Sequence, residues 1–391
     1  MPTTLRETFA EFEPLGVEDR APAPAPAPAA TSRLRPAYGF DDVAIVPGVE
    51  TLHPDDADLS WSLGGQRLTI PFIASAMDGV VDVPFAIAMG RLGGLAVLNL
   101  EGLQTRYEQP SEPLAHIAAA PREVATELMQ RLYQAPIRDD LVARRVREIK
   151  AAGVVAAVSA TPSLAERLGP LVAEAGGDIF VVQSTVTSRR FRSHSGAPSL
   201  DFSRFCAQVG LPVVVGNCVS YDAALELMET GIAALLVGVG PGAACTSREV
   251  LGIGVPQVTA TLDCAAARDA FYLRTGRYVP IVTDGGMRTG GDVCKAFASG
   301  ADAVMIGSPL AQSAEAPGHG HHWGMAAPHA GLPRGTRIKV GVNGTLEQIL
   351  FGPTSLTNGT QNLVGALRTC MGVCGAATLR EMHQVQMVIA P

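Results

Sequence analysis

A cysteine at the end of a glycine-rich loop is the residue of this chain best suited to nucleophilic chemistry. Three glycines, Gly238, Gly240 and Gly242, precede Cys245, and Pro241 stiffens the middle of the loop. Glycine lets backbone N–H groups approach closely, and N–H dipoles around a thiol lower its pKa toward the reactive thiolate. The same spacing occurs in dinucleotide-binding turns, but Pro241 interrupts the helix that such a turn should open. The spacing alone leaves both readings open.

Two further segments, Asp284-Gly285-Gly286 and Gly307-Ser308, suit the binding of a sugar phosphate. Each closes a short apolar run, and in (β/α)8 barrels the loops after the last two strands often hold phosphate through N–H groups. A carboxylate beside them can accept hydrogen bonds from both hydroxyls of a ribose. The alternative is a pair of tight turns with a capping aspartate. Because both loops fit together in one fold, we favour the phosphate site.

A histidine cluster follows these loops, formed by His319, His321, His322 and His329 around Trp323. A metal site would need convergent geometry and usually a carboxylate nearby. The segment is rich in glycine, proline and alanine, so we interpret it as a lid over the active site rather than a metal centre.

The elements that must position these residues alternate in type along the chain. Eight short apolar runs are each followed by a longer stretch of helical period, such as 83–92, 141–152 and 221–229. Runs without polar alternation are typical of strands buried on both faces. The runs are Ile70–Ala74, Leu95–Leu98, Val154–Val158, Ile179–Val182, Val213–Val215, Ala234–Val237, Ile281–Val282 and Ala303–Ile306. Eight strand–helix units predict an α/β fold of the TIM (β/α)8 type, with chemistry at the strands' carboxyl ends.

We divide the chain into an Ala/Pro-rich tail over residues 1–31 and one barrel domain over 32–391. The Ala-Pro alternation can neither form a helix nor bury a core, so the tail is predicted to be disordered. Barrels of this type routinely occupy the remaining length as a single domain.

Composition excludes several classes of function. Hydrophobic residues make up 47% of the chain and charged residues 17%, which favours a large buried core. The net charge of −7 argues against nucleic-acid binding, and no apolar stretch is long enough to span a membrane. The seven cysteines are odd in number and form no CxxC pair, so neither a disulfide framework nor a zinc site is expected. With no signal peptide, a cytoplasmic location follows by default.

Several motifs, taken in order, resemble those of the IMP dehydrogenase/GMP reductase family. They span about residues 38–382, nearly the whole predicted barrel. They comprise Tyr38 to Pro47, Ile70-Pro71 through Ser75-Ala76-Met77-Asp78, Gly216-Asn217, the cysteine loop, Asp284-Gly285-Gly286, Gly307-Ser308 and Met371-Gly372-Val373-Cys374-Gly375-Ala376. Only about fifty residues separate Asn99 from Val154, too few for the regulatory (CBS) domain pair that the family commonly inserts there. In lacking this pair, the chain resembles a compact bacterial branch of the family.

The resemblance implies a role for each matching residue. Cys245 would be the nucleophile that attacks C2 of the purine, with Thr246 and Ser247 beside it, Ser247 keeping the hydroxyl of a family threonine. Gln183, Ser184, Gly238 and Gly240 would lie on the cofactor side. Backbone carbonyls of Gly240, Gly242 and Cys245 would bind K⁺. Substrate would be bound by Ser75, Met77, Asn217, Asp284, Gly285, Gly286, Gly307, Ser308, Gly324 and Met325.

The reaction implied by the resemblance is the NAD-dependent oxidation of IMP to XMP through a Cys245 thioimidate, within guanine nucleotide synthesis. Covalent attachment divides a difficult step into two easier ones. The alternatives are GMP reductase, which converts GMP to IMP with NADPH, and a nucleotide-binding relative without turnover. A homotetramer is expected from the resemblance alone.

The departures from the family pattern concern the short flap between Gly324 and Arg334. The family's Arg-Tyr pair that activates water is absent there, which leaves Arg334, His329, Arg337 and Thr246 as candidates. Arg334 stands where reductases carry a catalytic glutamate, and this weakens the reductase reading because departing ammonia needs a proton donor. Gln183 replaces an aspartate of the cofactor side.

Overall fold

The computed structural model describes residues 34–194, 199–242, 247–324 and 336–391. Within them, Ala37–Pro391 folds as one unit around eight parallel strands. The boundary between residues 31 and 32 lies outside the described residues and stays a prediction.

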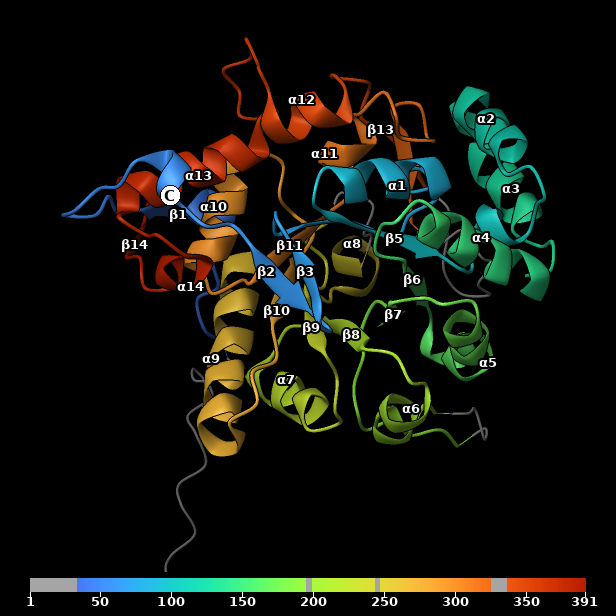
Figure 1. The fold of residues 1–391 in the computed structure, drawn as a ribbon, viewed down its shortest axis with the longest axis horizontal. Coiled ribbons are helices and arrows are strands. Elements are labelled where there is room, and N and C mark those ends of the chain that lie inside the picture. The colour runs from blue at the N-terminus through green and yellow to red at the C-terminus, as the bar shows by residue number, and fades with distance from the viewer. Residues whose placement is uncertain (1–33, 195–198, 243–246, 325–335) are drawn as a thin grey trace, which may run out of the picture. The chain divides into compact units, whose positions relative to one another are not determined.

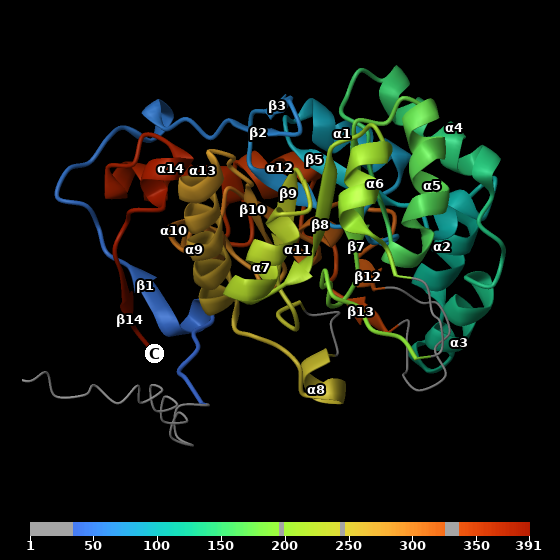
Figure 2. The ribbon, with the colours of Figure 1, turned by 90° about the horizontal axis from the view of Figure 1, so that it is seen from below.

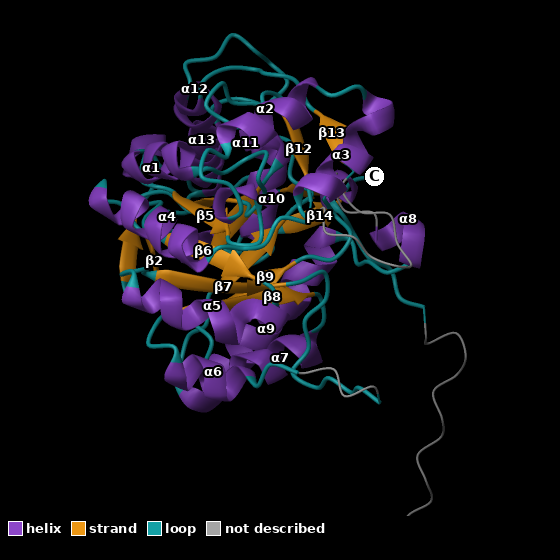
Figure 3. Cartoon of the chain, turned by 90° about the vertical axis from the view of Figure 1, so that its right-hand side faces the viewer, coloured by secondary structure: helices purple, strands orange, loops and turns teal. Residues whose placement is uncertain are grey.

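The strands close into a barrel in the order β10-β11-β4-β5-β6-β7-β8-β9. Figure 1 gives the fold, and Figure 3 shows strands β5 to β9 in orange with helices around them. The bounds of the barrel strands are β4 Phe72–Ala74, β5 Leu95–Asn99, β6 Ala157–Ala160, β7 Ile179–Gln183, β8 Val213–Cys218, β9 Ala234–Val237, β10 Ile281–Asp284 and β11 Ala303–Ile306. Almost every residue of these strands is buried, as expected where helices cover the outside and side chains fill the interior. All eight predicted strands are present, and the predicted TIM barrel is confirmed.

One predicted strand is displaced along the sequence. The run Val154–Val158 was expected to pair from its start, but β6 begins at Ala157. Gly153 turns the chain at a positive φ of 76° after the preceding helix. Val154 then packs against Gly90, where an added Cβ would lie 2.6 Å from the Cβ of Val154. Hydrophobicity here serves the packing of a loop on a helix rather than strand pairing.

Helices follow each strand and cover the barrel (Figure 1). The three predicted helices are confirmed to within two residues as α1, α4 and α7. Asp82 caps α1 by accepting a hydrogen bond from the N–H of Phe85. The covering helices are α1 Val83–Arg91, α4 Asp139–Ala151, α5 Pro162–Glu174, α6 Phe202–Gln208, α7 Tyr221–Met228, α9 Gln257–Thr275, α10 Gly290–Ala298 and α11 Ser308–Ala311.

A hairpin of β2 (Trp61–Leu63) and β3 (Gln66–Leu68) closes the amino-terminal end of the barrel. The indole N–H of Trp61 donates to the carbonyl of Ile70 at 3.1 Å, just before β4. Figure 2 shows this hairpin at the end of the barrel opposite to α8 (Ser247–Leu251) and the hairpin of β12 (His321–Trp323) and β13 (Arg337–Lys339). An active site can therefore open only at the carboxyl-terminal end of the barrel.

The remaining elements lie before, between or after the strand–helix units. They are η2 Phe40–Asp42, β1 Val43–Ile45, η3 Pro54–Asp56, η4 Leu103–Thr105, α2 Ser111–Ala119, α3 Arg122–Leu132, α12 Leu346–Phe351, α13 Leu363–Cys374, α14 Leu379–Met382 and β14 Met387–Ile389. Strand β14 pairs antiparallel with β1, so the two ends of the unit meet. Among the helices of the described ranges, none combines the length and apolar character needed to cross a membrane.

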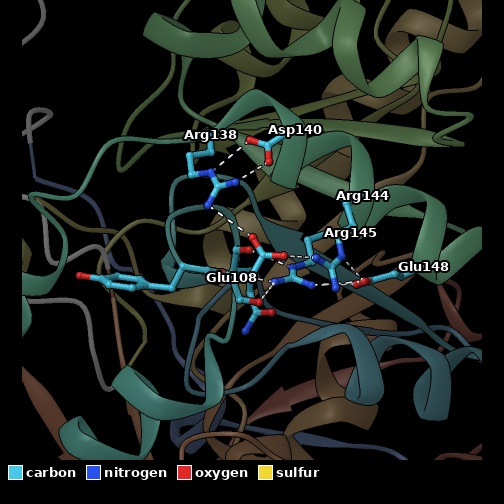
Figure 4. Close-up of polar contacts among 8 residues, drawn as sticks. Glu108, Arg138, Asp140, Arg144, Arg145 and Glu148 are labelled. Atoms are coloured by element: carbon cyan, nitrogen blue, oxygen red, sulfur yellow. Dashed lines mark hydrogen bonds and ion pairs between the residues drawn. The ribbon is translucent and has the colours of Figure 1, made fainter.

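An arginine-rich network anchors the segment that carries α2 and α3 to helix α4 (Figure 4). The buried side chain of Arg145 donates to the backbone carbonyl of Glu108 at 2.8 Å and to the carboxylate of Glu148. Arg138 and Arg144 both pair with the carboxylate of Glu108. Exposed ion pairs contribute little singly, but the buried guanidinium bonded to carbonyls gives this anchor a defined geometry.

Candidate active site

One cavity of about 760 Å³ opens at the carboxyl ends of the barrel strands. Every described residue that was assigned to the nucleophile, substrate, cofactor or K⁺ site lines it, although these residues come from six strand ends, α8 and the residue after β12. Three predicted residues, Cys245, Thr246 and Met325, lie outside the described residues. The predicted residues that line the cavity are Ser75, Met77, Gln183, Ser184, Asn217, Gly238, Gly240, Gly242, Ser247, Asp284, Gly285, Gly286, Gly307, Ser308 and Gly324.

The centre of the cavity wall is a hydrogen-bonded group of three polar side chains. Oδ2 of Asp284 accepts from Nδ2 of Asn217 at 2.8 Å and from Nε2 of Gln183 at 3.0 Å. Asn217 also donates to the carbonyl of Gly238 at 2.9 Å. Burial raises the pKa of Asp284 to about 6, since these two hydrogen bonds offset only part of the desolvation. Within the described ranges no donor bonds to Oδ1 of Asp284, so this oxygen remains available as an acceptor for a ligand.

The start of the cysteine loop rests on the neighbouring strand end. At Gly238 an added Cβ would lie 2.2 Å from the carbonyl oxygen of Asp284, so only glycine allows this approach. Gly242 lies against Gly285, with its Cα 3.5 Å from the position of an added Cβ there. The loops after β9 and β10 therefore pack as one wall.

The two predicted phosphate loops follow the paired strands β10 and β11, and the N–H of Gly285 donates to the carbonyl of Met305 at 3.1 Å. A Cβ added to Gly307 would meet Sδ of Met77 at 3.1 Å and Oγ of Ser75 at 3.5 Å, so the loops after β11 and β4 are in contact. Gly286 reaches its place at a positive φ of 83°. Ser308 opens α11, and its hydroxyl lies 2.9 Å from Nε2 of His322. Backbone N–H groups and hydroxyls around one small space suit an anion.

On the other side of the cavity, the ends of β5, β6 and β7 form a more polar wall. Asn99, Glu101, Thr161, Gln183 and Ser184 line it. The carboxylate of Glu101 accepts a hydrogen bond from the N–H of Thr161 at 2.5 Å, which joins the β5 and β6 loops. The cavity therefore reaches strand ends on all sides of the barrel. The predicted phosphate loops lie on one side of it only.

A buried network forms the wall beside the β12–β13 hairpin. Oδ2 of Asp78 accepts from the hydroxyl of Tyr133 and from the N–H of Leu103. The indole N–H of Trp323 donates to the Tyr133 hydroxyl at 2.8 Å. Burial raises the pKa of Asp78 to about 6. This network joins Leu103 and Tyr133, which precede α4, to Trp323 of β12.

The family model described as the IMP dehydrogenase / GMP reductase domain matches residues 37–390. The chain belongs to the IMP dehydrogenase/GMP reductase family. It is 42% identical to an uncharacterized oxidoreductase of Mycolicibacterium smegmatis, over 91% of this chain and 97% of that protein.

Members with named activities are more distant. Inosine-5′-monophosphate dehydrogenase of Cryptosporidium parvum is 28% identical, over 90% of this chain and 91% of that enzyme. A crystal structure of an IMP dehydrogenase/GMP reductase-like protein from Corynebacterium glutamicum superposes with a TM-score of 0.86 at 34% identity, covering 91% of this chain and 95% of that one. The chain is therefore an oxidoreductase of the IMP dehydrogenase/GMP reductase family, and its fold is shared along nearly the full length.

One candidate for water activation in this family member is wrong. The guanidinium of Arg337 donates to the carbonyls of Ile117, Ala118 and Ala120, at the carboxyl end of α2. A cation there bonds to carbonyls at the carboxyl end of the helix and interacts favourably with the helix dipole. Arg337 therefore ties the β12–β13 hairpin to α2 and is absent from the cavity lining. Arg334, His329 and Thr246 lie outside the described residues.

Several cavity residues were not predicted as site residues. Asp78 lay inside the motif that follows β4, so its position after a strand end could have identified it, whereas His322 lies on β12 and had only its place in the histidine cluster as a signal. Tyr133 carried no sequence signal and Trp323 only its place in the histidine cluster, because their contact depends on how α3 packs on the hairpin. Among the residues that the structure describes, no three His, Cys, Asp or Glu side chains converge as a metal site.

Replacing Tyr133 with phenylalanine is expected to destabilise the fold by about 1–3 kcal/mol, because the indole N–H of Trp323 then has no acceptor and Asp78 loses a donor. The measurement is urea unfolding at pH 7. The matched control is Tyr107→Phe, which removes a single hydroxyl bond to the carbonyl of Leu132 and should cost less. Equal losses in the two variants would contradict the proposed network.

Proposed function

We propose that this chain is an IMP dehydrogenase: it oxidises IMP to XMP with NAD through a covalent thioimidate on Cys245. The observation that carries the proposal is the cavity of about 760 Å³, with the loops after β9, β10 and β11 on one side and polar strand ends on the other. Such a cavity has room for a nucleotide and for a second ring stacked beside it. IMP dehydrogenase is also the named activity of relatives that align over nearly the whole chain.

The nucleotide is held by its ribose and phosphate in this proposal. Oδ1 of Asp284 accepts hydrogen bonds from the ribose hydroxyls, while Oδ2 stays bonded to Asn217 and Gln183. The N–H groups of Gly286 and Gly307 and the hydroxyl of Ser308 surround the phosphate. The ribose and base are supported by further residues that line the cavity, namely Ser75, Met77, Gly285 and Gly324. Met325 is proposed to contact the base from the flap.

Cys245 supplies the nucleophile. The residue lies outside the described residues, but Gly242 and Ser247 on either side of its segment both line the cavity. Its thiolate adds to C2 of the purine, and a hydride then leaves C2 to give the thioimidate. Water hydrolyses this bond, which releases XMP and restores the thiol. Thr246 and Ser247 are proposed to assist with their hydroxyls.

On the cofactor side, the available hydrogen-bonding groups suit the hydroxyls of a nicotinamide ribose. Both Nε2 hydrogens of Gln183 are engaged by Asn217 and Asp284, at 3.1 and 3.0 Å, so the side chain offers its carbonyl oxygen to ribose hydroxyls. The hydroxyl of Ser184, and the loop at Gly238 and Gly240, lie on the same cavity. When bound, the nicotinamide supplies the acceptor for the hydride.

For K⁺, two of the three proposed carbonyl donors, Gly240 and Gly242, lie on the cavity wall, whereas Cys245 lies outside the described residues. No step of the mechanism is routed through the ion. A homotetramer and a cytoplasmic location likewise remain proposals that rest on the family.

Absorbance at 340 nm tests the function directly. With purified full-length protein, IMP plus NAD should give a rise, as NADH forms with XMP. A fall with GMP plus NADPH and no rise in the first mixture would identify a GMP reductase instead. If neither mixture reacts while IMP binding is measurable by calorimetry, the chain is a nucleotide-binding relative without turnover.

A further inference from the structure

His322 is buried in the cavity wall, and neither the nucleophile nor the ribose site uses it. Its side chain is 1% exposed, and it sits on β12 next to Trp323. Its Nε2 lies 2.9 Å from Oγ of Ser308, the hydroxyl of the phosphate loop. Its Nδ1 is buried and has no hydrogen-bond partner among the described residues. The two ring nitrogens therefore have very different surroundings.

These surroundings select one form of the imidazole. A buried N–H without an acceptor is rare and costly, whereas a bare acceptor nitrogen is tolerated more often. The unpartnered Nδ1 therefore favours the neutral form with hydrogen on Nε2. The imidazolium would place a second N–H at Nδ1, so it is disfavoured further. Burial, followed by the charge of a protonated His321, lowers the pKa of His322 to about 4.

The charged groups on the neighbouring elements are of both signs. Strand β13 carries Arg337 and Lys339, of which Lys339 pairs in register with His321 and Ile338 with His322. The loop around Gly79 packs on the backbone of His322, and it carries Asp78 and Asp82. Asp78 is bonded to Tyr133 and Leu103, and Asp82 to the N–H of Phe85. Helix α11, which contacts β12, has no charged residue.

We propose that His322 is a positioning residue for the phosphate of the bound nucleotide: its neutral Nε2–H donates to Ser308 and turns the hydroxyl hydrogen of Ser308 into the cavity. A phosphate offers acceptors only, so a serine that donated to histidine would present its lone pairs to the anion. With the direction set by His322, Ser308 meets the phosphate as a donor. The inference rests on the proposed function for the identity of the phosphate carrier.

The form of the ring can be tested in the free protein, independently of any nucleotide. ¹⁵N spectra of histidine-labelled full-length protein, with the signal assigned by its loss in His322→Gln, should show the neutral Nε2–H form from pH 6 to 8. An Nδ1–H form or an imidazolium in that range would overturn the proposal.

Binding measurements test the role. His322→Leu should weaken IMP binding about tenfold, yet change inosine binding less than about twofold, because only the phosphate is affected. His322→Gln, whose amide can donate to Ser308, should keep IMP affinity within about threefold. In a Ser308→Ala background, His322→Leu should have almost no further effect on IMP, as expected for residues acting through one contact. Equal losses for IMP and inosine would indicate a structural role only.

The matched control is His383, another largely buried histidine with a lowered pKa, which bonds to the carbonyl of Ala301 away from the cavity. His383→Leu should leave IMP affinity unchanged. If wild-type protein binds neither IMP nor GMP, the proposed function fails, and inorganic phosphate becomes the probe for His322. A phosphate-dependent shift of the His322 signals would then still support the positioning role, and its absence would overturn it.

Discussion

Replacing Cys245 with alanine is expected to lower the rate of NADH formation from IMP by at least about 10³-fold, because without the thiol no thioimidate forms. The measurement is the initial rate at 340 nm with saturating IMP and NAD. Asp284 and the phosphate loops are untouched, so the variant should still bind IMP with an affinity within about threefold of the parent. Loss of turnover with retained binding is the signature of a residue that acts on the reacting atom.

The control for Cys245→Ala is Cys206→Ala. Cys206 lies on α6, is partly buried and is absent from the cavity lining; burial raises the pKa of its thiol to about 11, which makes it a poor nucleophile. This variant should keep the parent rate. Intact-mass analysis after acid quench of a reacting mixture should show a nucleotide adduct on the parent and on Cys206→Ala, but none on Cys245→Ala. A Cys245→Ala variant that turns over at the parent rate would remove the covalent mechanism.

Replacing Asp284 with asparagine is expected to have opposite effects on binding and on stability. The amide oxygen can still accept from Asn217 and Gln183, so the local structure is kept. The atom that faces the ribose in place of Oδ1 is then the amide nitrogen, which cannot accept hydrogen bonds from the ribose hydroxyls, so IMP affinity should fall about 10- to 100-fold. Titration calorimetry with IMP at pH 7.5 measures this loss.

The stability effect of Asp284→Asn depends on pH. Burial in the folded protein holds the pKa of Asp284 at about 6, above the usual value of 3.8 for an aspartate. A raised carboxyl pKa means that the folded state binds the proton more tightly, so this group disfavours folding increasingly as pH rises from about 4 to 6, and fully above that. Asp284→Asn removes the penalty. It should therefore be more stable than the parent by about 1–3 kcal/mol at pH 7.5, with little difference at pH 4.

Urea unfolding at the two pH values measures this difference in free energy. The control is Asp222→Asn at the exposed start of α7, which should show no comparable change between pH 4 and 7.5. A stability gain for Asp284→Asn that is the same at both pH values would contradict the assignment to a buried, raised-pKa carboxyl. A stability gain with unchanged IMP affinity would show that Asp284 does not bind the ribose.

Much of the site could be predicted from local sequence because a barrel converts order along the chain into position in space. Once the eight apolar runs are recognised as parallel strands, their carboxyl ends must share one face, so residues that follow them meet whatever their separation. This is why Ser75, Asn217 and Asp284 line one cavity. Glycine also carries its own signal, since Gly238 is required by the approach of the Asp284 carbonyl.

Contacts made outside the strand–helix repeat could be seen only in the tertiary structure. The sequence by itself determined the barrel, the order of its strands and the face that bears the site. It could not show that Tyr133 joins Asp78 to Trp323, or that Arg337 binds the end of α2 instead of facing the cavity. No periodicity links these residues, because their contacts depend on how α2 and α3 pack against the hairpin. The surroundings of His322 were decided in the same way, since the partner of each ring nitrogen depends on long-range packing.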